Sequence, residues 1–406
     1  MAKTKFICPY CFEEHMVDEI EFRCFNSRCG DFPDEKMTLY EMGDPNNPIK
    51  LKRTFNKAEA KESQGTDWAK CPECGEKTHK VICPSCHNLL PESTISGTDM
   101  IISVVGARAS GKSHFVGVLI NELRNRIAPS FGGALEGFDD SYARWERYFA
   151  KSLYDNNVKL ELTRSSLQNV DNGAYRPLIF KLKLPKKKKF FFGKDGIETF
   201  TFVFFDTAGE DLNDEDVMST VNKYIYKSAG IIFLLDPCQL GQVANKLDEK
   251  EIKNASPVDY SNATRSDEII TRVSNLIRND RNISQDKKID IPVAAVFSKF
   301  DILESILPQG LTVLNPSPHC RHGAFDMADW HNVDSEIRSL LTSWDEQSFI
   351  ANLDSNYEKY SFFGVSALGF NNNPDDRGHI NRPQPHRIED PILWLLEENK
   401  VIKANK

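Results

Sequence analysis

The sequence contains no long run of apolar residues. No stretch of about eighteen apolar residues occurs, so we expect no helix that spans a membrane. The first residues, MAKTKFICPYCFEE, also lack the apolar core of a signal peptide. Positive charge is in deficit, because 51 lysines and arginines stand against 59 aspartates and glutamates, for a net charge of −8. This acidity makes nucleic acid a possible but unfavoured partner.

Cysteine is scarce after residue 90. Eight of the ten cysteines come before that point in close pairs, whereas Cys238 and Cys320 stand alone. A secreted disulfide protein would not usually show this pattern, which is typical of metal binding in a reducing compartment. We therefore expect a cytoplasmic protein.

The paired cysteines predict two structural zinc ions. The pairs are CPYC, CFNSRC, CPEC and CPSC, and two thiolates on a tight turn hold one face of a tetrahedral zinc ion. Grouping neighbours along the chain predicts one site from the first two pairs and a second site from the last two. The expected ligands are Cys8, Cys11, Cys24 and Cys29, then Cys71, Cys74, Cys83 and Cys86.

Histidines lie near both predicted zinc sites. His15 is an alternative ligand in the first, whereas we expect His79 and His87 to lie beside the second without binding the metal. Redox-active pairs are the other interpretation, but the strand–helix–strand context of such sites is missing. Four protein ligands leave no open position for catalysis, so this region should bind partners or act as a spacer.

The chain is long enough for about two or three domains. We predict a zinc-binding module over residues 1–40, a polar linker over 41–66 and a zinc ribbon over 67–97. Residues 98–406 should form a three-layer α/β domain with a mostly parallel sheet.

Residues 106–113, GARASGKS, match the phosphate-binding pattern GxxxxGK[ST] at every fixed position. A buried strand is predicted just before them, over residues 100–105, and an amphipathic helix after them, up to residue 127. In that context the backbone N–H groups of the loop and of the helix start point at phosphates. Lys112 would contact the β and γ phosphates, and Ser113 would bind Mg²⁺.

A second strand ends in an acidic residue within TFTFVFFDTAGE. Asp206 closes this strand and would hold Mg²⁺ through water. Gly209, three residues later, would donate its N–H to the γ-phosphate. The DxxG pattern with the acidic residues that follow resembles the switch II region of GTPases.

Two later strands end in motifs that resemble those that read guanine. SKFD, residues 298–301, resembles [NT]KxD, and the Asp301 carboxylate can accept hydrogen bonds from guanine N1 and N2. Lys299 would pack its stem on the base, whereas Ser298 lacks the amide of the usual first residue. The SAL sequence at 366–368 resembles SA[KL], in which a backbone N–H reads guanine O6.

Residues 100–400 thus resemble a GTPase domain of the translation-factor-related (TRAFAC) class. With two zinc ribbons in front, the chain also looks like the double-GTPase families of bacterial conflict and antiviral defence. The resemblance implies GTP or GDP, Mg²⁺ and two zinc ions as cofactors. The expected nucleotide contacts are Gly106, Ala109, Ser110, Gly111, Lys112, Ser113, His114, Ser298, Lys299, Asp301, Ser366, Ala367 and Leu368.

The resemblance also implies a switch I threonine, and Thr163 is the only threonine of residues 129–175, a long insertion. Glu210 stands where many GTPases place the glutamine that orients water. Arg108 is either an arginine finger in cis or an ion-pair partner of a switch carboxylate. We therefore expect a slow GTPase that acts on a protein partner through its switch regions or zinc region.

Two rival functions stay open: a nucleotide-binding scaffold with negligible turnover, and a zinc-ribbon nucleic-acid binder driven by ATP. Residues 185–196, PKKKKFFFGKDG, are interpreted as a solvated hairpin tip, with anionic lipid or nucleic acid as the alternative ligand. The segment HCRHGAFDMADWHN has no clean metal-ligand spacing among His319, Cys320, His322 and His331, so a metal site there is disfavoured.

Overall fold

The computed structural model describes residues 3–161, 176–185, 196–205, 222–247, 252, 266–370, 372, 374–375 and 377–405. The chain divides into two compact units. One comprises Met1–Met100 with Glu198–Val203, and the other comprises Ile101–Ile197 with Phe204–Lys406. Below, Met1–Met100 is called the head.

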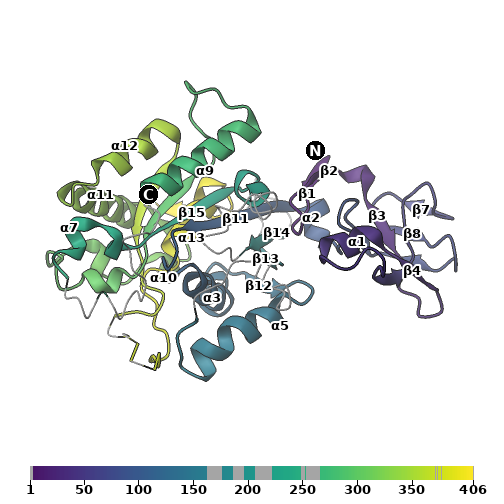
Figure 1. Ribbon diagram of the computed structural model, residues 1–406, viewed down its shortest axis with the longest axis horizontal. Coiled ribbons are helices and arrows are strands. Elements are labelled where there is room, and N and C mark those ends of the chain that lie inside the picture. Colours follow the sequence, from purple (N-terminus) through teal and green to yellow (C-terminus); the bar gives the residue numbers. More distant parts are fainter. Residues whose placement is uncertain are drawn as a thin grey trace. The chain divides into compact units, whose positions relative to one another are not determined.

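The head consists of short strands and short helices (Figure 1). Its strands are β1 (Lys5–Ile7), β2 (Glu14–Met16), β3 (Glu21–Arg23), β4 (Asp31–Pro33), β5 (Lys50–Lys52), β6 (Thr54–Phe55), β7 (Ser63–Gln64), β8 (Trp68–Lys70), β9 (Lys77–Thr78) and β10 (Val81–Ile82). Its helices are η1 (Val17–Glu19), α1 (Glu35–Tyr40) and α2 (Glu92–Ser96).

Residues 41–66, predicted as a polar linker, contain three of these strands. β5 pairs with β4, β6 with β3 and β7 with β8, all antiparallel. Phe55 of β6 is buried and stacks on Phe22 of β3. The linker prediction is therefore wrong, because these residues contribute both hydrogen bonds and apolar side chains to the fold of the head.

A mixed seven-stranded sheet follows, in the order β12-β13-β14-β11-β15-β16-β18. β11 pairs with β15, β15 with β16 and β16 with β18 in parallel, whereas β12 and β13 pair antiparallel, so the prediction of a mostly parallel sheet needs correction. The strands are β11 (Thr98–Gly106), β12 (Ala134–Gly137), β13 (Leu178–Pro185), β14 (Ile197–Phe204), β15 (Gly230–Leu235), β16 (Val293–Phe297) and β18 (Tyr360–Gly364).

Helices lie on both sides of this sheet, with α3 and α5 on one side and α9, α11 and α12 on the other (Figure 1). Every residue of β15 and β16 is buried, as expected of central strands covered on both faces. The main helices are α3 (Lys112–Glu122), η2 (Leu123–Ile127), α4 (Ala128–Ser130), α5 (Ser141–Trp145), η3 (Glu146–Asp155), α9 (Ser266–Arg281), α11 (Met327–Ser343), α12 (Gln347–Asn356) and α13 (Asp390–Glu398).

Shorter elements connect them: η7 (Pro237–Gln239), α7 (Gly241–Ala244), η9 (Phe300–Leu303), η10 (Thr312–Leu314), α10 (His319–His322), β17 (Phe325–Asp326) and β19 (Ala404–Asn405). Over the described part of the chain, every helix is too short or too polar to cross a lipid bilayer.

Candidate functional site

Four parallel strands of the large sheet end at one edge. In the ladder, Gly106 of β11 lies opposite Leu234 of β15, and Phe297 of β16 lies opposite Leu235 of β15 and Gly364 of β18. The loops that follow these strands therefore leave the sheet side by side. Ligands of open α/β sheets bind at this edge, beyond the carboxyl ends of the strands.

The first of these loops is GARASGKS, and its backbone favours glycine at both Gly106 and Gly111. A Cβ on Gly106 would lie 2.7 Å from the Leu234 carbonyl oxygen and 2.6 Å from Ser110 Oγ, which is closer than atoms can approach. Gly111 has φ +85°, a left-handed conformation that favours glycine, and α3 begins directly after it. The pattern read from the sequence thus corresponds to a tight turn into a helix.

Lys112 folds back over this loop. Its ammonium donates to the carbonyl oxygens of Gly106 at 2.9 Å and Ala107 at 3.0 Å, which fixes a buried positive charge inside the turn. Gly111, the residue before α3, has no side chain with which to cap the start of this helix. The N–H groups and the dipole of this helix end can therefore act on an anion together with Lys112.

Ser110 supplies an independent test of whether the loop fits a phosphate. Its Oγ is fully buried and has no hydrogen-bond partner within the described part of the chain. A buried hydroxyl without a partner costs free energy, which an acceptor oxygen in the loop would recover.

Arg108 is exposed at the outer side of the same turn, and Ser113 is half-buried in the first turn of α3.

His114, the next residue of α3, connects the loop to a distant segment. Its Nε2 accepts a hydrogen bond from the Leu160 N–H at 3.0 Å. Burial, reinforced by the positive charges of Lys299 and Lys159, lowers the pKa of His114 to about 4. The imidazole is therefore neutral at pH 7, as an acceptor nitrogen requires.

The SKFD loop follows β16 and lies next to GARASGKS. Ser298 Oγ donates to the Leu235 carbonyl oxygen at 3.0 Å, and Lys299 Nζ lies 2.6 Å from Asp236 Oδ2. Lys299 Cε lies 3.9 Å from the point where a Cβ on Gly111 would stand. The lysine stem thus reaches the phosphate loop. Asp236 was not predicted as a site residue, although its place directly after a buried strand was a usable signal.

Asp301 meets the loop that follows β18. Burial raises the pKa of its carboxyl, and a hydrogen bond from the Ser366 hydroxyl partly opposes this shift. Ser366 is buried and accepts the Gly369 N–H at 2.9 Å, whereas Ala367 and Leu368 are half-buried. The two predicted base-reading motifs are therefore in contact.

Several predicted residues lie outside the described residues: Asp206, Gly209, Glu210 and Thr163. The same holds for residues 186–195 of the Lys/Phe-rich loop. Their assignments stay predictions. Phe205, the last described residue before Asp206, directly follows β14 and is buried.

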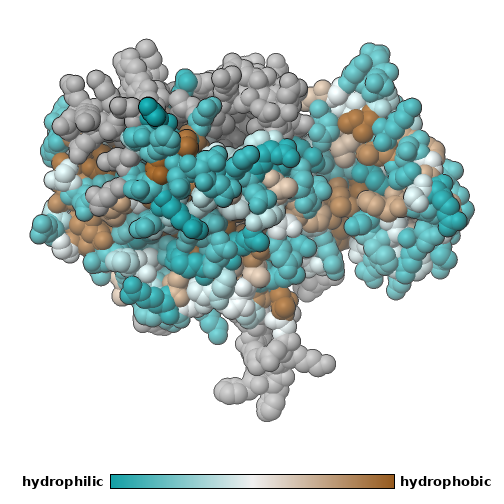
Figure 2. All heavy atoms as spheres, turned by 90° about the horizontal axis from the view of Figure 1, so that it is seen from below, coloured by the Kyte–Doolittle hydropathy of each residue, from teal (hydrophilic) through white to brown (hydrophobic). Residues whose placement is uncertain are grey.

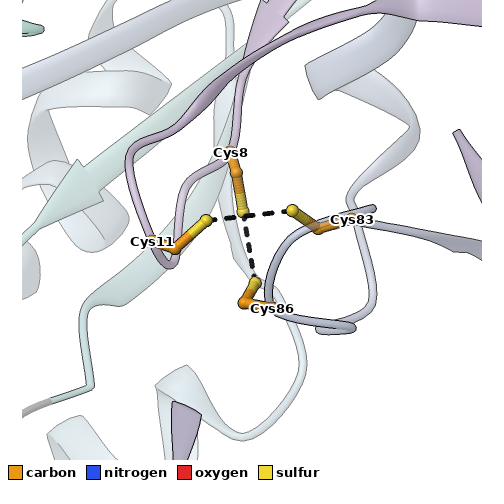
Figure 3. A group of neighbouring side chains, drawn as sticks. All are labelled: Cys8, Cys11, Cys83 and Cys86. Atoms are coloured by element: carbon orange, nitrogen blue, oxygen red, sulfur yellow. Dashed lines mark hydrogen bonds between the residues drawn. The ribbon is translucent and has the colours of Figure 1, made fainter. Parts of the chain in front are cut away.

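The eight paired cysteines form two groups of four, but not the predicted groups. Cys8 and Cys11 join Cys83 and Cys86, whereas Cys24 and Cys29 join Cys71 and Cys74. In the first group the four sulfur atoms point toward a common centre (Figure 3).

The strand pairing explains this exchange. β10 is antiparallel to β3, with Val81 opposite Phe22 and Ile82 opposite Glu21. Cys83, directly after β10, therefore emerges at the start of β3, whereas Cys24 lies beyond its other end. Cysteine pairs that are neighbours in the sequence therefore belong to different groups, and the predicted grouping of the cysteines is wrong.

The sulfur positions fit zinc in both groups. Four sulfurs about 2.3 Å from a tetrahedral centre lie about 3.8 Å from one another. The Sγ–Sγ distances are 3.7 Å for Cys8–Cys86 and 3.8 Å for Cys11–Cys83. In the second group they are 3.5 Å for Cys24–Cys74 and 4.0 Å for Cys29–Cys71.

Three of the four cysteine pairs share one backbone turn. In each, the residue after the second cysteine has positive φ and donates its N–H to the carbonyl of the first cysteine: Phe12 to Cys8, Gly75 to Cys71 and His87 to Cys83. The turn directs two thiols to the same side. CFNSRC, with four residues between its cysteines, does not make this turn.

The nearby histidines are not members of the groups. His15 Nε2 lies 3.6 Å from Cys83 Sγ, so it contacts a cysteine of the first group from outside. His87 lies between Asp34 at 2.7 Å and Glu21 at 2.9 Å, and His79 Nδ1 lies 2.8 Å from the Asp67 carbonyl oxygen. His87 and His79 therefore contact other groups and lie beside the cysteine turns, outside both four-cysteine groups.

A further group, His319, Asp329 and Asp390, has metal-like spacing. The buried guanidinium of Arg387 pairs with both carboxylates, at 2.9 Å from Asp329 and 2.6 Å from Asp390. An arginine thus already supplies the positive charge of this cluster. Of the histidines and the cysteine considered in HCRHGAFDMADWHN, only His319 belongs to the group.

Fold and site together define a mixed α/β protein with a glycine-rich phosphate-type loop and a head with two four-cysteine centres. No protein-family model matches the chain. The putative ESX-1 scaffolding and assembly protein SaeC of Mycolicibacterium smegmatis is 25% identical over 331 residues, covering 77% of this chain and 78% of that protein.

Two solved structures of the S. cerevisiae Ski7 GTPase-like domain are also similar, one bound to GDP and inorganic phosphate and one to GTP. Their TM-scores are 0.34 and 0.32, at 12% and 14% identity, over 75% and 76% of this chain. The chain spans about half the length of those solved chains, 50% and 51%.

Proposed function

We propose that the chain is a Mg²⁺-dependent guanine-nucleotide-binding switch of the P-loop class. One observation carries the proposal: GARASGKS, SKFD and SAL leave the same edge of one sheet, and their residues touch. Lys299 lies beside Gly111, and the Ser366 hydroxyl donates to Asp301. Three motifs that are distant in sequence thus lie together at the edge of the sheet where open α/β proteins bind ligands, which supports a single nucleotide site.

The phosphate end of the proposed site consists of the GARASGKS loop and the start of α3. Lys112, held by two loop carbonyls, would place its charge against the β and γ phosphates, and Ser110 would gain the acceptor that it lacks. Mg²⁺, when bound, would neutralise phosphate charge. Ser113 is its proposed ligand from α3, with Asp206 and Thr163 as further proposed ligands.

The base end consists of Asp301 and the SAL loop. Guanine offers two N–H donors to one carboxylate, whereas adenine does not offer them in that arrangement. Burial favours the protonated form of Asp301, while donors to the carboxylate favour its ionised form. The hydrogen bond from Ser366 therefore helps to keep an acceptor available for guanine.

Hydrolysis is proposed as slow without a partner. Gly209 would sense the γ-phosphate, and Glu210 would position water less well than glutamine, since its negative charge lies near the phosphates. Arg108 is exposed beside the loop and would serve as an arginine finger or as an ion-pair partner of a switch carboxylate. A scaffold with negligible turnover is the second candidate, favoured by Glu210 and Ser298.

We further propose a protein partner for the head. The similar SaeC protein is described as a putative scaffolding and assembly protein, a role that involves other proteins. On the face shown in Figure 2, hydrophilic residues predominate. Four exposed large apolar side chains nevertheless occur in the head: Met16, Phe25, Leu39 and Met42. The TRAFAC assignment stays a proposal, whereas the likeness to defence families finds no support in the comparisons.

Calorimetry with GTP, GDP and ATP in the presence of magnesium tests the nucleotide assignment. We expect wild type to prefer guanine nucleotides and Asp301→Ala to lose this preference. Glu304→Ala is the matched control, because it removes an exposed carboxylate from the same loop. Equal binding of ATP and GTP, with Asp301→Ala unaffected, would refute the assignment. Phosphate release with and without a candidate partner then separates the GTPase from the scaffold.

A further inference from the structure

Two contacts continue the pairing of β15 and β16 beyond the ends of both strands. The last ladder pair is Leu235 with Phe297. Ser298 then donates its N–H and its hydroxyl to the Leu235 carbonyl oxygen, both at 3.0 Å. The next residue of each segment makes the second contact: Lys299, after Ser298, places its Nζ 2.6 Å from Oδ2 of Asp236, which follows Leu235. The SKFD loop is therefore held to β15 by two successive contacts.

The Asp236 carboxylate is fixed at both oxygens. Oδ2 faces Lys299, and Oδ1 accepts the Cys238 N–H at 3.0 Å, which caps the helix η7. The exposed fraction of the Asp236 side chain is 0%. A carboxylate removed from water in this way requires charged and hydrogen-bonding partners, so its orientation and that of Lys299 depend on each other.

Lys299 is the residue through which this contact reaches the phosphate loop. Its backbone is left-handed, with φ +53°, so the chain turns sharply after Ser298. Its Cε lies 3.9 Å from the Cβ position on Gly111 while its ammonium is held by Asp236. The four-carbon stem of Lys299 is thereby held in one conformation beside GARASGKS. The hydroxyl of the short Ser298 side chain is engaged by the Leu235 carbonyl.

We propose that Asp236 is a positioning residue of the nucleotide site, which holds the Lys299 stem beside Gly111 as one wall of the purine pocket. This inference rests on the proposed function, because it assigns Asp236 a part in base selection at that same site. Asp236 acts through Lys299 and does not itself contact the nucleotide. Its loss would therefore weaken binding of a base while leaving binding of a bare polyphosphate almost unchanged.

The test compares GDP, ADP and magnesium tripolyphosphate, titrated into the full chain and its variants. Asp236→Asn keeps the shape and the Cys238 contact but removes the charge that holds Lys299. We expect its GDP affinity to fall about tenfold, the equivalent of one hydrogen bond to a charged group, with tripolyphosphate affinity unchanged. Lys299→Met should lower GDP affinity similarly, and the double variant should be no worse than either single variant, because both remove the same contact.

The matched control is Asp334→Asn. Asp334 accepts from Ser361 Oγ and the Phe362 N–H, both at 2.8 Å, near the start of β18 and therefore at the opposite end of that strand from the site. It should leave GDP affinity and base preference unchanged. A merely structural role for Asp236 would lower the melting temperature and the affinity for all three ligands together.

The outcomes separate the inference from the proposed function. Wild type that binds no guanine nucleotide contradicts both. Wild type that prefers GDP, with wild-type GDP affinity in Asp236→Asn, contradicts only the role of Asp236. If Asp236→Asn does not fold, the double variant decides, because it leaves no unpaired buried charge. Retention of the full GDP preference in the double variant overturns the proposal.

Discussion

The crossed grouping of the cysteines gives the sharpest test of the head. Replacing Cys8 and Cys11 by serine removes one turn from one centre. In the structure, the thiols that lose their partners are Cys83 and Cys86; Cys83 lies 72 residues after Cys11, and Cys86 lies 78 residues after Cys8. Grouping by chain neighbours would instead release Cys24 and Cys29.

The size of the effect follows from the sulfur geometry. Each centre has four sulfurs at edges of 3.5–4.0 Å, close to the ~3.8 Å of a zinc tetrahedron. Two thiols cannot complete that tetrahedron, so the affected centre should release its metal and the zinc content should fall from two ions to one. Binding of structural zinc is worth about 10–16 kcal/mol in small peptides, so the unliganded turn should open.

Native mass spectrometry measures the metal content, and thiol alkylation with peptide mapping identifies the exposed cysteines. We expect Cys83 and Cys86 to become reactive while Cys71 and Cys74 stay protected. Replacing Cys24 and Cys29 is the reciprocal control and should expose Cys71 and Cys74. Alkylation of Cys24 in the first variant, with Cys83 protected, would refute the crossed arrangement.

Three other substitutions test the described packing. Gly106→Ala places a methyl group 2.7 Å from the Leu234 carbonyl, so it should lower the free energy of unfolding by about 1–3 kcal/mol in urea titrations and abolish nucleotide binding; unchanged stability would contradict the close approach. The pKa of His114 is lowered to about 4, from a usual value near 6.5, so the unfolded chain takes up the proton first as the pH falls. Wild type should lose about 1–2 kcal/mol of stability between pH 7 and pH 5, and His114→Gln should lose less. Arg387→Met leaves the buried Asp390 and the half-buried Asp329 without their cation and should cost about 3–5 kcal/mol, measured by urea unfolding, whereas a loss below about 1 kcal/mol would show that the carboxylates find other partners.

The sequence predicted that the paired cysteines form two groups of four, but not which pairs join. A CxxC turn is local, and the shared N–H to carbonyl bond of Cys8, Cys71 and Cys83 depends only on the residues within each turn. Which turns meet depends on how β10 pairs with β3, and that register is a tertiary property of short strands with few side chains to specify it. The same strands explain why the predicted linker is folded.

In the large sheet the local signals were stronger. The strand predicted over residues 100–105 lies within β11 (Thr98–Gly106), and the helix predicted up to residue 127 corresponds to α3 (Lys112–Glu122) and η2 (Leu123–Ile127), since apolar runs and helical spacing mark such elements directly. The role of Asp236 was missed, because an aspartate after a buried strand has many possible partners. The partner becomes visible only when β16 places Lys299 beside it.

The two ends of the proposed site share one further segment, residues 157–160. On one side, Ile380 donates its N–H to the Asn157 carbonyl at 2.8 Å, and Lys159 donates to the Gly378 carbonyl at 2.9 Å. On the other side, Leu160 donates to His114 of α3 at 3.0 Å. The chain that follows SAL and the helix that follows GARASGKS are thus hydrogen-bonded to the same short stretch. A ligand that shifts either one changes bonds to residues 157–160, so the base end and the phosphate end should respond together to a bound nucleotide.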